Sequence, residues 1–371
     1  MNHNIPILSF FTGGGFLDIG FEKAGFLPVW TNEVNPRFVK LYEYGMTEWR
    51  RSNSPYASHA KISTTRNLEN LFAPEILGQA FTGDIPSLFG IIGGPPCPDF
   101  SSGGKNMGGK GVNGRLTKIF INRIVKIKPD FFVFENVSGL YKIKKHRKFL
   151  EALEKKLGKN GYCLDIRVLN SLEYGVPQDR ERLFVVGVQR KYLCHCLGKS
   201  IHVKQRGWFP WPVIIKYKNA KAKFNWPDIV INGETPILPS GVPLELTTYS
   251  VLNPNNCPSL IQNGKDTFKA YSRKFMIIKE GDTKRKSFKR LHRYRFSPTA
   301  CYGNNEVHLH PWHKRRLSVR EAMRIQGIPD SYVLPEDASL TSKFALVSNG
   351  VPVPLSQEVA AKLKQLIKKG I

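Results

Sequence analysis

Residues 5–24 read IPILSFFTGGGFLDIGFEKA, and this stretch decides the fold class. The apolar run 5–11 predicts a buried strand, the three glycines at 13–15 predict a tight turn, and residues 16–24 predict a helix. Glycines at such a turn let a ligand approach the backbone, and the helix N-terminus that follows favours negative charge. The stretch therefore predicts an α/β unit with a ligand site at its turn.

The alternation of short apolar runs with amphipathic stretches continues to residue 190. We expect further strands at 27–31, just before Gly93, and at 131–134, 168–170 and 182–188, and helices at 116–127 and 145–157. This order is typical of an α/β domain with a mostly parallel sheet and helices on both faces. A helix is expected to resume from Ser318 to Arg324, and the amphipathic stretch 354–369 to pack back on this domain.

After Arg190 the chain changes in character, because helical periodicity is lost and prolines, tryptophans and basic residues multiply. We expect a first domain at 1–190 with 345–371, a smaller strand-and-loop domain at 191–310, and a hinge region at 311–344.

The charge of the chain points to a polyanionic partner. Lys and Arg number 56 against 29 Asp and Glu, a net charge of +27, which favours nucleic acid. Residues 191–310 hold 20 Lys and Arg but only 7 Asp and Glu. Within 273–295 the basic residues are interleaved with aromatic ones, which suits phosphate contact and stacking. A solvated charged face is the alternative interpretation of this segment.

Cysteine usage and hydropathy exclude several classes of protein. The six cysteines are irregularly spaced, so no disulfide framework is expected. Cys194 and Cys196, with His195 and His202 nearby, lack the spacing of a zinc site, and we expect no metal. No apolar run reaches about 18 residues and no secretory signal is evident, so we expect no membrane span and a reducing, intracellular compartment.

Two acidic residues extend the predicted ligand site. Glu33 follows the second predicted strand about 20 residues after the glycine turn, where a carboxylate can accept hydrogen bonds from ribose hydroxyls. Asp84, in the sequence Gly83-Asp84-Ile85, could cap an adenine. These features favour an adenosine-containing cofactor. A nicotinamide dinucleotide is disfavoured because the glycine spacing is not G-x-G-x-x-G.

Three further motifs carry candidate chemistry. Residues 93–101 read GGPPCPDFS and present Cys97 between prolines in a stiff loop after a strand, as a nucleophile requires. Glu135 ends a predicted strand at the ligand edge of an open α/β sheet. Arg180 and Arg182 alternate on an extended chain and could clamp an anion or a base edge. Each motif taken singly also has a structural interpretation. Cys97 could be a buried cysteine in a tight turn, Glu135 a surface acid, and the arginine segment the exposed, charged start of a strand.

Together these motifs resemble those of the DNA (cytosine-5)-methyltransferases, over nearly all of the chain outside about 191–295. The matching stretches, in family order, are Phe11–Gly15, Pro95–Cys97, Glu135–Val137, Gln178 with Arg180 and Arg182, Arg316–Ala322 with Gln326–Asp330, and Asn349–Val353. The resemblance implies a Rossmann-like S-adenosylmethionine-dependent methyltransferase domain and places a target-recognition domain at 191–310.

The resemblance also implies an activity: methylation of C5 of a cytosine within a specific short duplex DNA sequence. It implies base flipping, covalent addition of Cys97 to C6, and S-adenosyl-L-methionine as cofactor. The implied catalytic residues are Cys97, Glu135, Arg180 and Arg182. The implied cofactor-binding residues are Phe11, Gly13, Gly15, Glu33, Asp84, Ile85, Pro96, Leu116, Asn349 and Val351. The expected DNA-binding residues are Ser101, then Lys105 and Lys110 in a glycine-rich lid at 103–111, and Arg285, Arg290 and Arg293.

Four positions depart from the family pattern. Pro98 follows the nucleophile where glutamine is usual. This departure affects the DNA contacts that the glutamine makes in the family and not the chemistry. Ser9 stands where an acid often opens the first motif, Phe16 where glycine is common, and Gly350 where serine is usual. Residues 36–80 are also longer than expected. None of these departures removes a reacting group.

Three other functions stay open on the sequence. A tRNA cytosine-5 methyltransferase can share this catalytic core, although the basic insert favours DNA. A non-catalytic DNA-binding protein on the same scaffold and a dinucleotide oxidoreductase are the others. The expected partners are double-stranded DNA and, acting on the same site without being bound, a restriction endonuclease. We expect a monomer in the cytoplasm of a bacterium, associated with the nucleoid.

Overall fold

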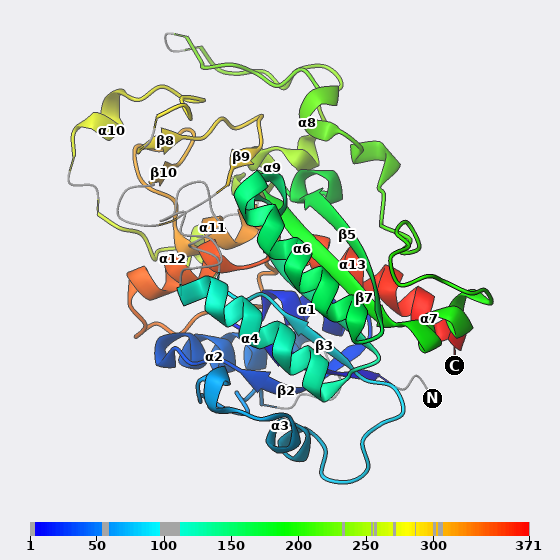
Figure 1. The fold of residues 1–371 in the computed structure, drawn as a ribbon. Coiled ribbons are helices and arrows are strands. Elements are labelled where there is room, and N and C mark those ends of the chain that lie inside the picture. Colours follow the sequence, from blue (N-terminus) through cyan, green and yellow to red (C-terminus); the bar gives the residue numbers. More distant parts are fainter. Residues whose placement is uncertain are drawn as a thin grey trace.

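A computed structural model describes residues 4–53, 59–96, 112–231, 234–253, 255, 258–269, 272–285, 287–299, 302 and 307–370 (Figure 1). Its centre is a sheet in the strand order β2-β1-β3-β4-β7-β5. The strands are β1 (Ile5–Phe10), β2 (Phe26–Asn32), β3 (Gly90–Gly93), β4 (Phe131–Val137), β5 (Tyr162–Asn170) and β7 (Glu181–Gln189). In this sheet β7 runs antiparallel to β4 and β5, on either side of it, and the other pairings are parallel.

Helices cover both faces of this sheet. One face packs on α1 (Phe16–Lys23), α7 (Arg190–Leu197) and α13 (Val353–Ile367). The other face packs on α3 (Ala73–Ala80), α4 (Val112–Ile127) and α6 (Lys144–Lys159), while α5 (Gly139–Lys142) leads into α6. A third apolar cluster joins α1 to α2 (Pro36–Asn53), α11 (Val319–Ile325) and α12 (Leu340–Asn349). The predicted mostly parallel α/β fold is confirmed.

The strands and helices expected up to residue 190 are present, and most are longer than their apolar runs. β5 begins six residues before the predicted strand because its first half is buried and continuous with the sheet. Helix α2 and helix α12 were not predicted from the sequence. The long α2 accounts for much of the extra length between residues 36 and 80.

The apolar core reaches beyond residue 190. Ile201, Trp208, Phe209 and Trp211 are buried in the same cluster as α7 and the strands of the sheet. The indole N–H of Trp208 donates to the Leu164 carbonyl, and Asp165 Oδ2 accepts from the Phe209 amide. We therefore place the proposed boundary of the second domain near residue 214, because the segment before it is part of the first core.

The second part of the chain contains little regular structure among its described residues. It holds the short helices α8 (Ala220–Lys223), α9 (Thr248–Leu252) and α10 (Lys274–Ile277) and the two-residue strands β8 (Lys289–Arg290), β9 (Ser297–Pro298) and β10 (His308–Leu309). β10 pairs with β8, and β9 pairs with β6 (Gln178–Asp179). Figure 1 shows this part at one end of the sheet, where β6 lies just before the Arg180–Arg182 segment. No helix in the described chain is long and apolar enough to cross a membrane.

Candidate active site

Glu135 and Arg182 meet at the carboxyl end of β4. In the antiparallel pairing of β4 with β7, Arg182 lies opposite Val137, so its side chain reaches diagonally to Glu135 on the same face. Arg182 Nε lies 3.0 Å from Glu135 Oε1, and the side chains are only 11% and 9% exposed. The predicted pair of functional residues from two separate motifs is thus brought together in a largely water-excluded position.

Burial raises the pKa of the Glu135 carboxyl, and the charges of Arg182 and Arg180 oppose the shift without cancelling it. The ion pair with Arg182 alone would favour the carboxylate. Removal from water outweighs it here because almost the whole carboxyl group is enclosed. A carboxyl in this state is suited to hold or deliver a proton.

The loop that carries Cys97 begins against Glu135. A Cβ atom on Gly94 would lie 2.8 Å from Glu135 Oε2, so only glycine lets the backbone pass this close to the carboxyl. Asn136 Nδ2 donates to the Pro95 carbonyl at 3.4 Å and ties the loop to the end of β4. Cys97 itself, with Pro98, lies outside the described residues, as do Ser101, Lys105 and Lys110.

Arg180 is fully buried, and its guanidinium contacts the last motif. Its Nη2 donates to the carbonyls of Ser348 at 2.6 Å and Gly350 at 2.8 Å. Gln326 Nε2 donates to the same Gly350 carbonyl, at 2.9 Å. Arg180 therefore acts on the site by holding the turn after α12, and its charge favours the ionised form of Glu135.

The glycine turn between β1 and α1 has the backbone of a ligand cradle. Phe11, Gly13 and Gly15 all have positive φ, which is strained for Phe11 and natural for the two glycines. Glu33 Oε2 accepts from the Gly13 amide at 3.0 Å, and its Oε1 accepts from the Asn35 amide at 2.8 Å. Burial raises the pKa of Glu33. The carboxylate is thus fixed beside the turn, as a ribose-binding residue requires.

Asp84 and Ile85 lie elsewhere. They occupy an exposed loop that enters β3 at its amino end, the edge of the sheet opposite to Glu33 (Figure 1). The segment 60–66 holds the expected place instead, because Ser63 and Thr64 pair with Thr31 and Asn32 at the carboxyl end of β2. Sequence reasoning missed this segment since it carries no acid, and we remove Asp84 and Ile85 from the proposed cofactor site.

The other expected cofactor residues lie at or near the same edge. Pro96 is exposed at the last described position of its loop, and Leu116 is half-buried in the first half of α4. Asn349 ends α12, and Val351 is buried in the turn that leads into α13. Their main-chain positions keep them in the proposed site.

Two departures from the family pattern fit each other in space. A Cβ atom on Gly350 would lie 2.1 Å from Phe16 Cδ2, so the Phe16 ring fills the space that a side chain at position 350 needs. Phe16 is 2% exposed and packs edge-on against Tyr332, whose hydroxyl donates to the Gly14 carbonyl at 2.8 Å. The phenylalanine is accommodated because position 350 is glycine.

We expect Gly350→Ser to destabilise the protein by about 1–3 kcal/mol through overpacking against Phe16. The backbone adds no strain, because Gly350 has φ −68°, which serine adopts freely. Phe16→Ala should cost about 3–5 kcal/mol alone. Because the truncation makes room for the serine, the double variant should be more stable than the sum predicts by about 1 kcal/mol or more. Urea unfolding of the four proteins tests this, with Gly83→Ser as control at an exposed position with no neighbour within 4 Å. Additive effects would show that the two positions are independent.

The third departure, Ser9, faces a buried acid. Ser9 Oγ donates to Asp18 Oδ1 at 2.7 Å, and the Tyr42 hydroxyl donates to Asp18 Oδ2 at 3.3 Å. An acid at position 9 would bring a second carboxyl against Asp18. Burial raises the pKa of Asp18 to about 7, with the two hydroxyl donors opposing the shift.

Asp18→Asn should therefore change how stability depends on pH. The folded protein keeps the Asp18 proton up to about pH 7, whereas the unfolded chain releases it near 3.8. As pH rises from 4 to 7, the free energy of unfolding of the wild type should fall relative to that of the variant, by at most about 4 kcal/mol. Above pH 7 the difference between the two proteins should stay constant. Thermal unfolding at several pH values measures this. A stability difference that does not vary with pH would contradict the buried, titrating state of Asp18.

The expected DNA-binding arginines differ in accessibility. Arg285 is 57% exposed and pairs with Asp282 at 2.6 Å. Arg293 is held by Glu280 through two hydrogen bonds of 2.9 Å. Arg290 is 5% exposed and donates only inward, to main-chain carbonyls. We retain Arg285 as a proposed phosphate contact and remove Arg290, because its guanidinium does not reach the surface.

Comparison with known proteins gives one consistent result. A family model described as C-5 cytosine-specific DNA methylase matches residues 5–365. The type II methyltransferase M.NmeDI of Neisseria meningitidis serogroup C is 41% identical over 98% of this chain and 84% of its own. M.FnuDI of Fusobacterium nucleatum is 28% identical over 98% and 95%. Among solved structures, the S. pombe Dnmt2 methyltransferase has the same fold, with a TM-score of 0.59 at 13% identity over 98% and 99% of the two chains.

Proposed function

The chain belongs to the family of C-5 cytosine-specific DNA methylases, and on this basis we propose that it methylates C5 of a cytosine within a specific short sequence of double-stranded DNA. The observation that supports this most directly is the Glu135–Arg182 pair, 3.0 Å apart and largely buried, against which the loop that leads to Cys97 begins. The loop that leads to the proposed nucleophile, an enclosed acid and a cation, from three segments of the chain, then meet at one edge of the sheet.

The proposed cofactor is S-adenosyl-L-methionine, which supplies the methyl group when bound. The residues that would hold it are Phe11, Gly13, Gly15 and Glu33, with the turn at Asn349–Val351. Two observations favour an adenosine ligand there: the positive φ angles of the turn open its backbone to a ligand, and Glu33 stands fixed beside it by two amide donors.

The protein's own residues would divide the chemistry as follows. The Cys97 thiolate adds to C6 of the cytosine, which makes C5 nucleophilic. Glu135, with its raised pKa, holds or protonates N3 so that charge does not accumulate on the ring. Arg182 steadies the carboxyl, and its proposed second role is to hold the cytosine O2. At the end of the reaction the C5 proton is lost and Cys97 leaves C6.

The cytosine must leave the duplex to reach a buried pair, at a cost of a few kcal/mol that DNA contacts offset. We propose that residues beyond about 214 provide these contacts and that the protein is the modification half of a restriction-modification system. The names of M.NmeDI and M.FnuDI as type II methyltransferases support this role.

Mapping of methylated cytosines in the DNA of a host that expresses the protein tests the proposal. We expect methylation confined to one short sequence context. A parallel assay on purified duplex DNA and on tRNA distinguishes the proposed function from the principal alternative, a tRNA cytosine-5 methyltransferase. Methyl transfer to tRNA in the absence of transfer to duplex DNA would overturn the proposed substrate.

A further inference from the structure

The segment 310–316, between β10 and α11, forms a closed loop. Leu309 and Arg316 pair as an antiparallel bridge at its base. The His310 amide donates to the Arg315 carbonyl at 3.0 Å, and the Leu317 amide donates to the His308 carbonyl at 3.2 Å. His313 and Lys314 are exposed at its tip. The loop is therefore a short projection with a defined base.

Arg290 holds this loop from one side. Its guanidinium donates to the carbonyls of His310 and His313 at 2.7 and 2.9 Å, and to those of Phe275 and Ile278 at 2.6 and 2.7 Å. Burial lowers the pKa of this arginine, and Glu280 opposes the shift only through space. Burial of a cation among neutral acceptors is unfavourable unless its donors are satisfied. Here one side chain fixes the segment 275–278 and the 310–316 loop relative to its own strand β8.

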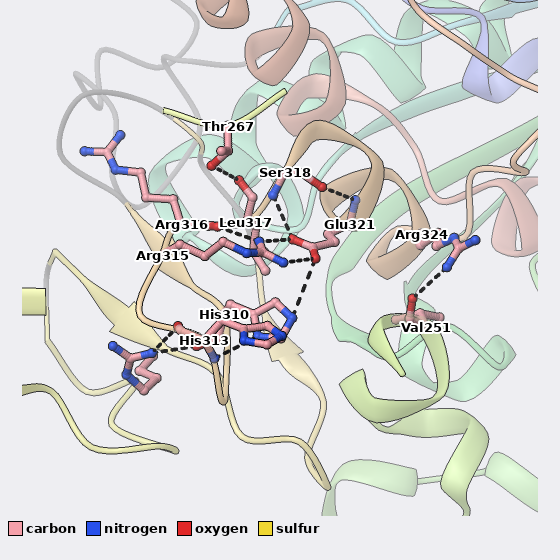
Figure 2. A network of polar contacts seen from close by, with 11 residues as sticks. Val251, Thr267, His310, His313, Arg315, Arg316, Leu317, Ser318, Glu321 and Arg324 are labelled. Atoms are coloured by element: carbon pink, nitrogen blue, oxygen red, sulfur yellow. Dashed lines mark hydrogen bonds and ion pairs between the residues drawn. The ribbon is translucent and has the colours of Figure 1, made fainter. Parts of the chain in front are cut away.

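Glu321 of α11 holds the loop from the other side (Figure 2). Arg315 donates to both of its carboxylate oxygens, at 2.7 and 2.6 Å. The Ser318 amide donates to Oε2 at 2.8 Å within a capping box, and His310 Nε2 lies 3.6 Å from Oε1. The loop is thus joined rigidly to the helix that follows it.

The tip adds other side chains to this frame, and the ring centre of His313 lies 4.5 Å from that of His310. Trp312 packs near Tyr249, and the Arg293 guanidinium lies 5.2 Å from the centre of its ring. Burial and the charge of Arg315 lower the pKa of His313, so its imidazole is neutral near pH 7 and can both donate and accept a hydrogen bond. Lys314 adds an exposed cation. Aromatic, amphoteric and cationic groups together suit contact with base edges and phosphates in a DNA groove.

We propose that the 310–316 loop contacts duplex DNA and determines sequence specificity, with His313 and Lys314 as contacting residues and Arg290 and Glu321 as positioning residues. This rests on the proposed function. A rigid loop discriminates between sequences because a wrong base cannot be met by rearrangement of the backbone. The basic segment 273–295 then contributes through Arg290, which builds the loop, rather than only through phosphate contacts at its surface.

The test uses the full-length protein and the duplex defined by mapping its methylated cytosines. We expect His313→Ala/Lys314→Ala to weaken binding to this duplex about tenfold and to lower the ratio of methylation at the mapped sequence to single-base variants of it. Cofactor affinity should not change. Lys126→Ala is the matched control, because Lys126 is exposed near the end of α4 that lies at the opposite edge of the sheet.

Arg290→Lys tests the frame, since a lysine keeps the charge but cannot supply the same fork of donors. We expect a lower methylation ratio, as for the tip variant. The ratio does not depend on the amount of folded protein, so a loss of yield with an unchanged ratio would refute a positioning role. A tip variant that matches Lys126→Ala in both affinity and ratio would overturn the proposal. If the mapping finds no methylated cytosine, only the proposed function is refuted, and the loop is then tested by comparing the binding of the wild type and the tip variant to a pool of random-sequence duplexes.

Discussion

Glu135→Gln will slow methyl transfer by about 10²–10⁴-fold, the usual contribution of a positioned proton donor or acceptor. Glutamine has nearly the shape of glutamate and can still contact Arg182, whose Nε lies 3.0 Å from Glu135 Oε1 in the native pair. It cannot deliver a proton to N3. Single-turnover rates on the mapped duplex measure the effect, and DNA affinity should change little.

The pH dependence of the methyl-transfer rate provides a second test of this role. Burial raises the pKa of Glu135, so the protonated form persists above the usual range and is lost as pH rises through that pKa. The wild-type rate should therefore fall on the alkaline side, and this limb should be absent from Glu135→Gln. Glu181→Gln is the matched control, since it changes the same group at an exposed pair with Lys142 on the same edge. Equal effects of the two changes, or a pure loss of DNA affinity, would contradict the role of Glu135.

Cys97→Ser will reduce methylation by about 10⁴-fold or more, in the range found when nucleophiles are removed. An unperturbed cysteine is about 3% thiolate at neutral pH, whereas a serine hydroxyl is almost never ionised. Cofactor and duplex binding should be retained, because the change removes only the reacting sulfur.

The covalent step can be observed separately from turnover. With S-adenosyl-L-methionine and a duplex that carries 5-fluorocytosine at the target, the wild type should form a stable covalent adduct and Cys97→Ser should not, because fluorine replaces the C5 proton and cannot be released after methyl transfer. Cys194→Ser is the control: its half-buried sulfur accepts from the Ile201 amide, a role that serine can fill. Adduct formation by Cys97→Ser would assign the nucleophile to another residue.

Local pattern was sufficient for the first domain up to residue 190. The strand-turn-helix at 5–24 and the alternation that follows predicted its fold because buried strands and amphipathic helices carry their periodicity in the chain itself. The same reasoning extended too far at Asp84, where an acid of the right type lies at the amino end of β3, away from Glu33. Which edge of a sheet a loop occupies depends on how the preceding chain folds back, and no short motif records that.

Arg290 shows the same limit in the second part of the chain. From the sequence it is one basic residue among many, and its neighbours suggest a surface. In the structure it is buried among the carbonyls of residues 275, 278, 310 and 313. Charge density along a chain reports attraction to a polyanion, but it does not tell which cations point outward.

By itself the sequence determined the α/β fold and the family and predicted the reacting groups, because strand-ending glycines, acids and a proline-bracketed thiol are local in the chain. Only the tertiary structure decided which distant residues depend on one another. It joined Phe16 to Gly350, Ser9 to Asp18 and Arg290 to the 310–316 loop. Each of these pairings depends on packing volume or on the burial of charge, which arise only when separate segments are brought into contact.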